Sequence, residues 1–210
     1  MLTQLQKQAV IGLFFFMVCA TSINAGTIGV SPVRVTLSEN QKIGSLSVRN
    51  DGTEPVTMQM EVLNWSQREG KSVFTTTREL LANPPIFTIP AGRSQLVRVG
   101  LRSAPDAKSE LTYRVILQEL PPPPNPDLMG TRMTIRISLP VFVLPEIEAK
   151  ALLHWQAVRT PQGALKISLS NNGNAHIQIK NFKLLLLDSA QPWVTHQSSD
   201  YVLAGQSRDW

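Results

Sequence analysis

The stretch Met133–Val143, with the sequence MTIRISLPVFV, most constrains what this chain can fold into. Its apolar side chains fall on alternate positions: Met133, Ile135, Ile137, Leu139 and Val141. A period of two places them on one face of an extended strand. Pro140 cannot donate a ladder hydrogen bond, so we expect the strand at a sheet edge or near its own end. Such an apolar edge must be covered, either by this protein's own core or by another chain.

The residues before this stretch contain a series of short strand patterns separated by turns. The hydrophobic content of 42% is enough for a core, and the 15 prolines favour strands and turns. The expected strands are Ile28–Leu37, Ile43–Val48, Val56–Trp65, Ile86–Ile89, Ser94–Leu101 and Leu111–Leu120, with a charged turn at Ser66–Lys71. With Met133–Val143 these give seven strands, a pattern typical of an immunoglobulin-like β-sandwich over residues 26–144.

A second series of strands follows the Leu144-Pro145-Glu146 segment, which we interpret as a domain boundary. The expected strands are Ala151–Val158, Ala164–Ser170, His176–Leu187, as one long or two short strands, and a last one starting near Tyr201. The fold class is therefore all-β, with two immunoglobulin-like β-sandwich domains. Residues 145–210 are few for an independent sandwich, so we expect the second domain to be incomplete as given.

The first 25 residues have the features of an export signal. Lys7 supplies a positive charge, and Ala9–Ala20 is an apolar run that is too short to span a membrane. Ala25 is a plausible cleavage-site residue, and an uncleaved amphipathic anchor is the alternative. Cys19, the single cysteine, lies inside this segment, so the mature chain would have no thiol and no disulfide. We expect an exported product that is not an integral membrane protein.

Composition and motifs argue against several classes of function. The chain has 20 basic and 15 acidic residues, but the basic ones are scattered and form no run with interleaved aromatics, so no nucleic-acid partner is expected. His154, His176 and His196 lack metal-ligand spacing, and we expect His176 on a strand surface. No nucleophile elbow or phosphate-binding loop occurs, so we expect no enzyme activity and no cofactor.

Several segments together resemble the PapD-like family of periplasmic pilus-assembly chaperones, which have two immunoglobulin-like domains. No single segment is specific, but their order and spacing are. The branch resembled is the one associated with spore-coat-protein-U-like pilins. The segments are Ser31–Val35, Leu46–Gly52, Asn83–Phe87, Pro90–Gly92, Val97–Val99, Tyr113–Arg114, Glu119–Pro122 and Ile135–Val143.

The resemblance implies donor-strand complementation, in which the chaperone lends a strand to a pilin subunit that lacks one. It also implies a periplasmic location and transfer of the subunit to an outer-membrane usher. The lent strand here would present Met133, Ile135, Ile137 and Leu139. The alternative is that this apolar row only packs the protein's own core.

The resemblance also implies basic residues that bind the carboxylate at the subunit's C-terminus. Arg34 matches the first of these anchors. The second is a lysine in the family, but Pro140 occupies that position here. Arg114 is our preferred replacement, because an antiparallel hairpin would place it beside the end of the lent strand. Arg136 is the alternative, and each arginine could also be an ordinary surface charge.

A family ion-pair network that fixes the two domains is only partly present. Glu110 occupies its acidic position, Leu144 stands in the arginine position, and the third member would lie beyond residue 210. The angle between the domains is therefore not predicted. As an alternative function, an exported β-sandwich could serve as a structural or adhesive module without lending a strand.

Overall fold

The computed structural model describes residues 28–102, 108–121, 133–185 and 191–210. These residues form fifteen strands and no helix, so the predicted all-β fold is confirmed. The expected export signal at 1–25 lies outside the described residues, as does most of the proline loop that follows residue 121. Within the described ranges, no helix is long and apolar enough to cross a membrane.

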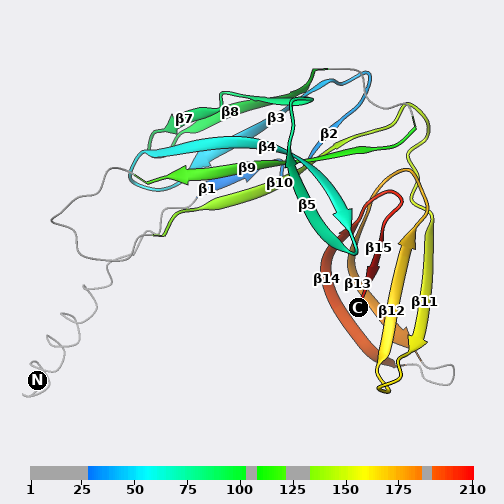
Figure 1. Ribbon diagram of the computed structural model, residues 1–210. Helices are drawn as coiled ribbons and strands as arrows, with labels where there is room; N and C mark the ends of the chain where they lie inside the picture. The colour runs from blue at the N-terminus through cyan, green and yellow to red at the C-terminus, as the bar shows by residue number, and fades with distance from the viewer. Residues whose placement is uncertain (1–27, 103–107, 122–132, 186–190) are drawn as a thin grey trace, which may run out of the picture.

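The first sandwich consists of two facing sheets (Figure 1). One sheet has the order β1 (Ile28–Ser31), β3 (Ile43–Asn50), β8 (Ser94–Leu101) and β6 (Leu80–Asn83). The other has the order β2 (Val35–Leu37), β10 (Arg136–Val143), β9 (Leu111–Leu120), β4 (Val56–Arg68) and β5 (Lys71–Thr76), and β7 (Ile86–Ile89) also pairs with β4.

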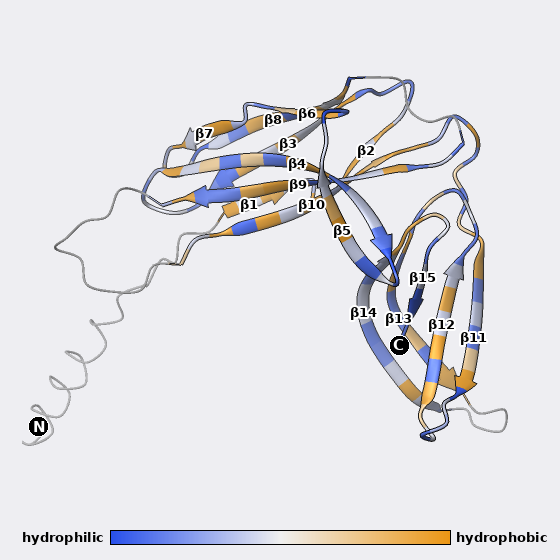
Figure 2. Ribbon diagram, viewed as in Figure 1, coloured by the Kyte–Doolittle hydropathy of each residue, from blue (hydrophilic) through white to orange (hydrophobic). Residues whose placement is uncertain are grey.

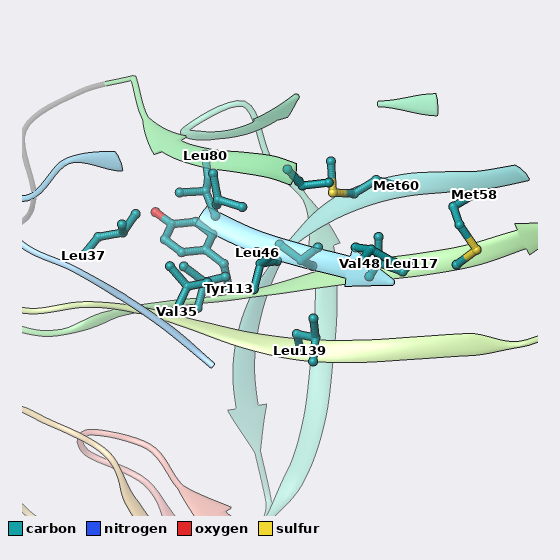
Figure 3. Close-up of a cluster of buried hydrophobic side chains, with 14 of the residues drawn as sticks. Val35, Leu37, Leu46, Val48, Met58, Met60, Leu80, Tyr113, Leu117 and Leu139 are labelled. Atoms are coloured by element: carbon teal, nitrogen blue, oxygen red, sulfur yellow. The ribbon is translucent and has the colours of Figure 1, made fainter. Parts of the chain in front are cut away.

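The core of this sandwich follows directly from alternation in the strands. Leu46 and Val48 on β3 face Tyr113 and Leu117 on β9, and Figure 3 shows them in one cluster with residues from β2, β4 and β10. Their neighbours in sequence point outward, as the alternating hydropathy of β4 and β10 in Figure 2 indicates. The Tyr113 hydroxyl donates to Glu79 at 2.8 Å. Burial, and then this carboxylate, raise the pKa of Tyr113 well above its usual range.

The second sandwich is smaller. Its sheets are a three-stranded one, β11 (Leu153–Arg159), β12 (Leu165–Asn171) and β15 (Ser207–Asp209), and a two-stranded one, β13 (Ile177–Leu185) and β14 (Pro192–Val202). Leu169, Ile179 and Val202 form its buried cluster. Apolar side chains nearby remain partly exposed, including Trp155 at 42% and Trp193 at 58%. Because little apolar surface is removed from water, the hydrophobic stabilisation of this part is small.

The β4–β5 hairpin differs from the sequence prediction and connects the two sandwiches. The predicted turn at Ser66–Lys71 is wrong, because β4 continues to Arg68 and the turn comprises only Glu69 and Gly70. β9 pairs with β4 only as far as Asn64, so the hairpin projects beyond its sheet. Figure 1 shows it lying against the second sandwich. The backbone carbonyl of Gly70 accepts a hydrogen bond from Arg208 of β15 at 3.1 Å.

Candidate functional site

The edge of β10 is open over its first half, which carries the predicted donor residues Ile137 and Leu139, whereas Met133 and Ile135 precede the strand. β10 pairs with β9 along its whole length, but its parallel pairing with β2 covers only Val141–Val143. Among the described residues, no strand pairs with the other edge of Arg136–Pro140. Pro140 therefore lies on a sheet edge, where its missing N–H leaves no gap in a ladder.

The apolar row on and before β10 changes from exposed to buried along its length. Met133 is 89% exposed, Ile135 and Ile137 are half-buried, and Leu139 is only 5% exposed. Leu139 belongs to the core of the first sandwich, and Ile137 packs partly against that core. The part of the row that is free to contact another chain is therefore its beginning, whereas Leu139 already has partners.

Glu119 of β9 fixes the start of this exposed segment. Its backbone N–H donates to the Ile135 carbonyl at 2.9 Å, and its side-chain carboxylate accepts from the Ile135 N–H at 3.0 Å. Both hydrogen bonds lie on the β9 side of the segment, so the extended backbone is held in place while its opposite edge stays free.

Arg114 lies in the middle of the outer face of the same sheet. In the strand register Arg114 is opposite Pro140 on one side and Leu63 on the other, as the expected hairpin geometry requires. Its guanidinium carbon is 3.9 Å from the centre of the Trp65 ring. Its Nε is buried and has no hydrogen-bond partner. Burial lowers the pKa of this guanidinium, although an arginine remains charged at neutral pH.

Arg34 lies near Arg114, and Arg136 lies further away. Arg34 is exposed and directly precedes Val35, which pairs with Val141. It is therefore beside the Pro140–Arg114 row, roughly two strand spacings or about 10 Å across the sheet from Arg114. Arg136 is also exposed but lies four residues along β10 from Pro140, or about 13 Å. Arg34 therefore lies somewhat nearer to Arg114 than Arg136 does.

An aromatic cluster from both sandwiches lies beside Arg114. Trp65 and Phe142 come from the first sandwich and Tyr201 from the second, and Leu203 is buried with them. The ring centres of Trp65 and Tyr201 are 5.3 Å apart in an edge-to-face arrangement. This geometry is favourable for aromatic pairs and stabilises the contact beyond the effect of burying the two rings. The second sandwich therefore forms part of the wall around Arg114.

Glu110 and His176 form a second contact between the sandwiches. The carboxylate of Glu110 accepts from the His176 backbone N–H at 2.7 Å and lies 2.8 Å from Nδ1 of the same residue. The two side chains are 1% and 16% exposed. The prediction that His176 lies on a strand surface is wrong, because this carboxylate and the Phe142 ring enclose it. In the sequence, His176 is recognisable only as the residue before Ile177 in a strand pattern, and such a pattern does not reveal a partner 66 residues away.

Gln67, near the tip of the hairpin, forms a third contact. Its side-chain Nε2 donates to the Tyr201 carbonyl at 2.8 Å, and its Oε1 accepts from the Leu203 N–H at 2.9 Å. The buried amide of Gln67 thereby bonds to one backbone carbonyl and one backbone N–H at the end of β14, in the way that a neighbouring strand would. Sequence reasoning missed Gln67 because the residue was assigned to a turn.

In the described part of the chain, no three His, Cys, Asp or Glu residues lie close enough together to hold a metal ion. The site combines an open strand edge, an apolar row and two arginines, Arg34 and Arg114, on the same sheet. Such an arrangement can bind an extended peptide and a carboxylate.

Comparison with known proteins identifies the family. Residues 27–148 match the family described as "Pili and flagellar-assembly chaperone, PapD N-terminal domain". The chain belongs to this family of pilus-assembly chaperones. Chaperones of this family are not enzymes, and the protein is a chaperone of pilus assembly. The more specific resemblance, to the branch associated with spore-coat-protein-U-like pilins, remains a prediction.

Individual relatives agree with this assignment. The chain is 25% identical over 174 residues to the "Uncharacterized fimbrial chaperone YhcA" of Escherichia coli K12, covering 81% of this chain and 75% of that protein. The chaperone–tip subunit complex CsuC–CsuE of Acinetobacter baumannii contains a similar fold, with a TM-score of 0.68 at 22% identity over 88% of this chain and 86% of that one. The complex of SafB chaperone and SafA pilin from Salmonella enterica gives 0.64 at 16% identity, over 88% and 83%.

Proposed function

We propose that this chaperone works in the periplasm, binds unfinished pilin subunits by lending them the edge of β10, and passes them to an outer-membrane usher. The observation that carries the proposal is the open edge of Arg136–Pro140 with exposed apolar side chains directly before it. A subunit strand could hydrogen-bond to this edge while its groove covered Met133, Ile135 and Ile137. Leu139 would stay in the chaperone's own core and support the lent segment from within.

We further propose that Arg34 and Arg114 bind the subunit's C-terminal carboxylate. Both lie beside Pro140, at the end of the open edge, so a peptide paired with β10 would end close to them. The Arg114 ring contact holds the guanidinium flat, and its partly desolvated surroundings strengthen a charge-assisted hydrogen bond. Arg136 is too far along the strand to share the same carboxylate.

The remaining parts of the proposal concern the chain as a whole. We infer that residues 1–25 direct export and are removed, that residues 26–144 form the strand-lending domain, and that residues 145–210 form the second domain. The chaperone–pilin complexes among the similar structures, such as SafB with SafA, support a pilin subunit as partner.

The test is co-expression with a candidate pilin, followed by size-exclusion chromatography of the periplasmic fraction. We expect a one-to-one complex and degradation of the subunit when the chaperone is absent. Ile135→Asp should abolish the complex and leave the chaperone folded, because Ile135 lies outside the buried core. Arg34→Ala and Arg114→Ala should each weaken binding by about 2 kcal/mol, or roughly 30-fold. Arg98→Ala, at an exposed site on β8, is the matched control.

The alternative function, a structural or adhesive module, predicts different results. In that case the native chain would retain no subunit, and Ile135→Asp would change neither its folding nor its interactions. A soluble protein that never retains a pilin would refute the proposed role of the β10 edge. Equal retention of the pilin by Arg34→Ala and by the native chain would refute the proposed anchor.

A further inference from the structure

The pairing of β9 with the lent segment continues past the start of β10, but in an altered form. The ladder between the two strands runs as far as Arg136, which is opposite Gln118, so the next pair along is Ile135 and Glu119. In an antiparallel ladder, every second pair of opposite residues exchanges two backbone hydrogen bonds. This pair makes the first of them, because the Glu119 N–H donates to the Ile135 carbonyl at 2.9 Å.

A side chain supplies the second hydrogen bond of this pair. The Ile135 N–H donates to the carboxylate of Glu119 at 3.0 Å, in the place of a backbone carbonyl. The ladder of β9 with β10 ends at Gln118, whereas its ladder with β4 continues to Leu120. A hydrogen bond to a carboxylate is stronger than one to a neutral carbonyl. The Glu119 side chain therefore extends the pairing on the β10 side beyond the point where the regular ladder stops.

These two bonds decide which groups the segment presents at its open edge. Along a strand, the backbone groups of successive residues point to opposite edges, and their side chains point to opposite faces. Since both polar backbone groups of Ile135 are bonded to β9, those of Thr134 and Arg136 are directed to the open edge. The Ile135 side chain is held on the same face as Ile137, which packs partly against the core. A slip of one residue would turn the apolar row to the opposite face.

We propose that Glu119 is a positioning residue that lengthens the lent strand from Arg136 back to Thr134, and so adds the Ile135 side chain to the surface that a subunit binds. The inference rests on the function proposed above, because it concerns the same open edge. Without the carboxylate, the described hydrogen bonds would leave only the Glu119 N–H to hold this segment on β9. A subunit would then have to order the segment on binding, and such ordering costs affinity.

The first test is hydrogen exchange of the free chaperone, followed by NMR at single amides. Glu119→Ala removes the acceptor of the Ile135 N–H, and this amide should exchange about tenfold faster, as expected for the loss of one hydrogen bond. Glu119→Gln keeps an acceptor oxygen and should restore slow exchange. The Ile137 amide lies inside the ladder, opposite Leu117, and should be unchanged in both variants. Unaltered exchange of Ile135 in Glu119→Ala would overturn the role of the carboxylate.

Binding of a pilin subunit is the second test. Glu119→Ala should weaken binding about tenfold, and Glu119→Gln should restore it to within about twofold of the native chain, because the glutamine oxygen accepts the same N–H. Glu39→Ala is the matched control, since it removes an exposed carboxylate two residues after Leu37, which pairs with the other end of β10. Binding by Glu119→Gln that is as weak as that by Glu119→Ala would overturn the proposed hydrogen bond as the cause.

A double-mutant cycle separates positioning from general effects on the chaperone. If Glu119 acts through Ile135, Glu119→Ala should weaken binding by only about threefold or less in an Ile135→Ala background, since the two effects are coupled. Equal weakening in both backgrounds would overturn the proposal, because Glu119 would then act independently of the segment. A native chain that binds no subunit would refute the proposed function itself, a result distinct from equal weakening, which refutes only the role of Glu119.

Discussion

Asn171 is a wholly buried amide that closes the turn after β12. Its Nδ2 donates to the carbonyls of Ala175, Val202 and Leu203, and its Oδ1 accepts from the Gly173 N–H. Asn50 does the same after β3, with its Nδ2 on the carbonyls of Glu54 and Ile89 and its Oδ1 on the Gly52 N–H. Both sandwiches therefore use one asparagine to satisfy buried backbone groups that the strands leave unpaired.

Asn171→Ala should destabilise the second sandwich by about 2–3 kcal/mol, because several buried carbonyl and N–H groups lose their partner at once. Urea unfolding followed by tryptophan fluorescence measures the change. Asn172→Ala, at the next and exposed position, should change the free energy of unfolding by less than about 0.5 kcal/mol. Equal effects of the two substitutions would show that the buried amide has no special role.

Single residues also show where sequence reasoning succeeded and failed. Arg114 could be placed beside Pro140 because hairpin pairing fixes which residues are opposite. His176 was misjudged, since a contact between distant segments leaves no local pattern. The stacking of Phe142 on His176 could not be predicted either, because it depends on how the second sandwich is positioned.

β10 has two structural environments along one strand. Its end, Val141–Val143, has neighbouring strands on both sides, whereas its first part is a sheet edge that follows the exposed Met133. The sequence pattern is continuous from Met133 to Val141, so alternation alone could not show where the core ends. The change follows from β2, which starts only at Val35 and covers only part of the edge.

Substitutions of the buried Leu139 in β10 and of Ile135, just before the strand, should therefore have different effects. Leu139→Ala should reduce the free energy of unfolding by about 2–5 kcal/mol, because it leaves a cavity in the core. Ile135→Ala should cost clearly less stability but weaken subunit binding more. Thermal unfolding and subunit pull-down, measured on both variants, separate the two effects. A larger stability loss for Ile135→Ala would contradict this division of the strand.

The turn between β12 and β13 offers another test, at Gly173. A side chain there would overlap the carbonyl oxygen of Lys150 and lie 2.6 Å from the Leu152 backbone nitrogen. The connection between the sandwiches must then shift, and Gly173→Ala should cost about 1–3 kcal/mol of stability. Gly29→Ala on β1 has its nearest neighbour at 3.7 Å and is the control. Chemical denaturation compares them, and a neutral Gly173→Ala would mean that the connection is not tightly packed.

On the scale of the whole molecule, the predicted sandwich architecture was recoverable from the sequence, but the joint between the sandwiches was not. Strand alternation and turn residues are local signals, and they located most strands of the first sandwich. The joint depends on the hairpin β4–β5, which was predicted as a shorter strand and a turn. The family's ion-pair network is only partly present in the sequence, where Leu144 stands in its arginine position. In the structure, Glu110, Gln67 and Arg114 contact the second sandwich.

Gln67→Ala should loosen this joint. The Leu203 N–H and Tyr201 carbonyl would lose their partner, which costs about 1–3 kcal/mol. Because the second sandwich has a small core, we expect calorimetry of the variant to show it melting at a lower temperature than the first. Gln95→Ala, whose side chain contacts only its own strand neighbour among the described bonds, should leave the transition unchanged. A single unshifted transition in Gln67→Ala would show that the hairpin contact is dispensable.

The long strand β4 also has a mechanical consequence. Its first part is bonded to β9 from Thr57 to Asn64, and its far end is bonded to the second sandwich through Gln67. β4 is therefore one continuous strand that is bonded to both sandwiches. A force that tilts the second sandwich must bend β4 or break its hydrogen bonds to β9, which is the strand directly beside β10. A mechanical pull on the second sandwich would thus be transmitted to β10, the strand that we propose is lent to the pilin.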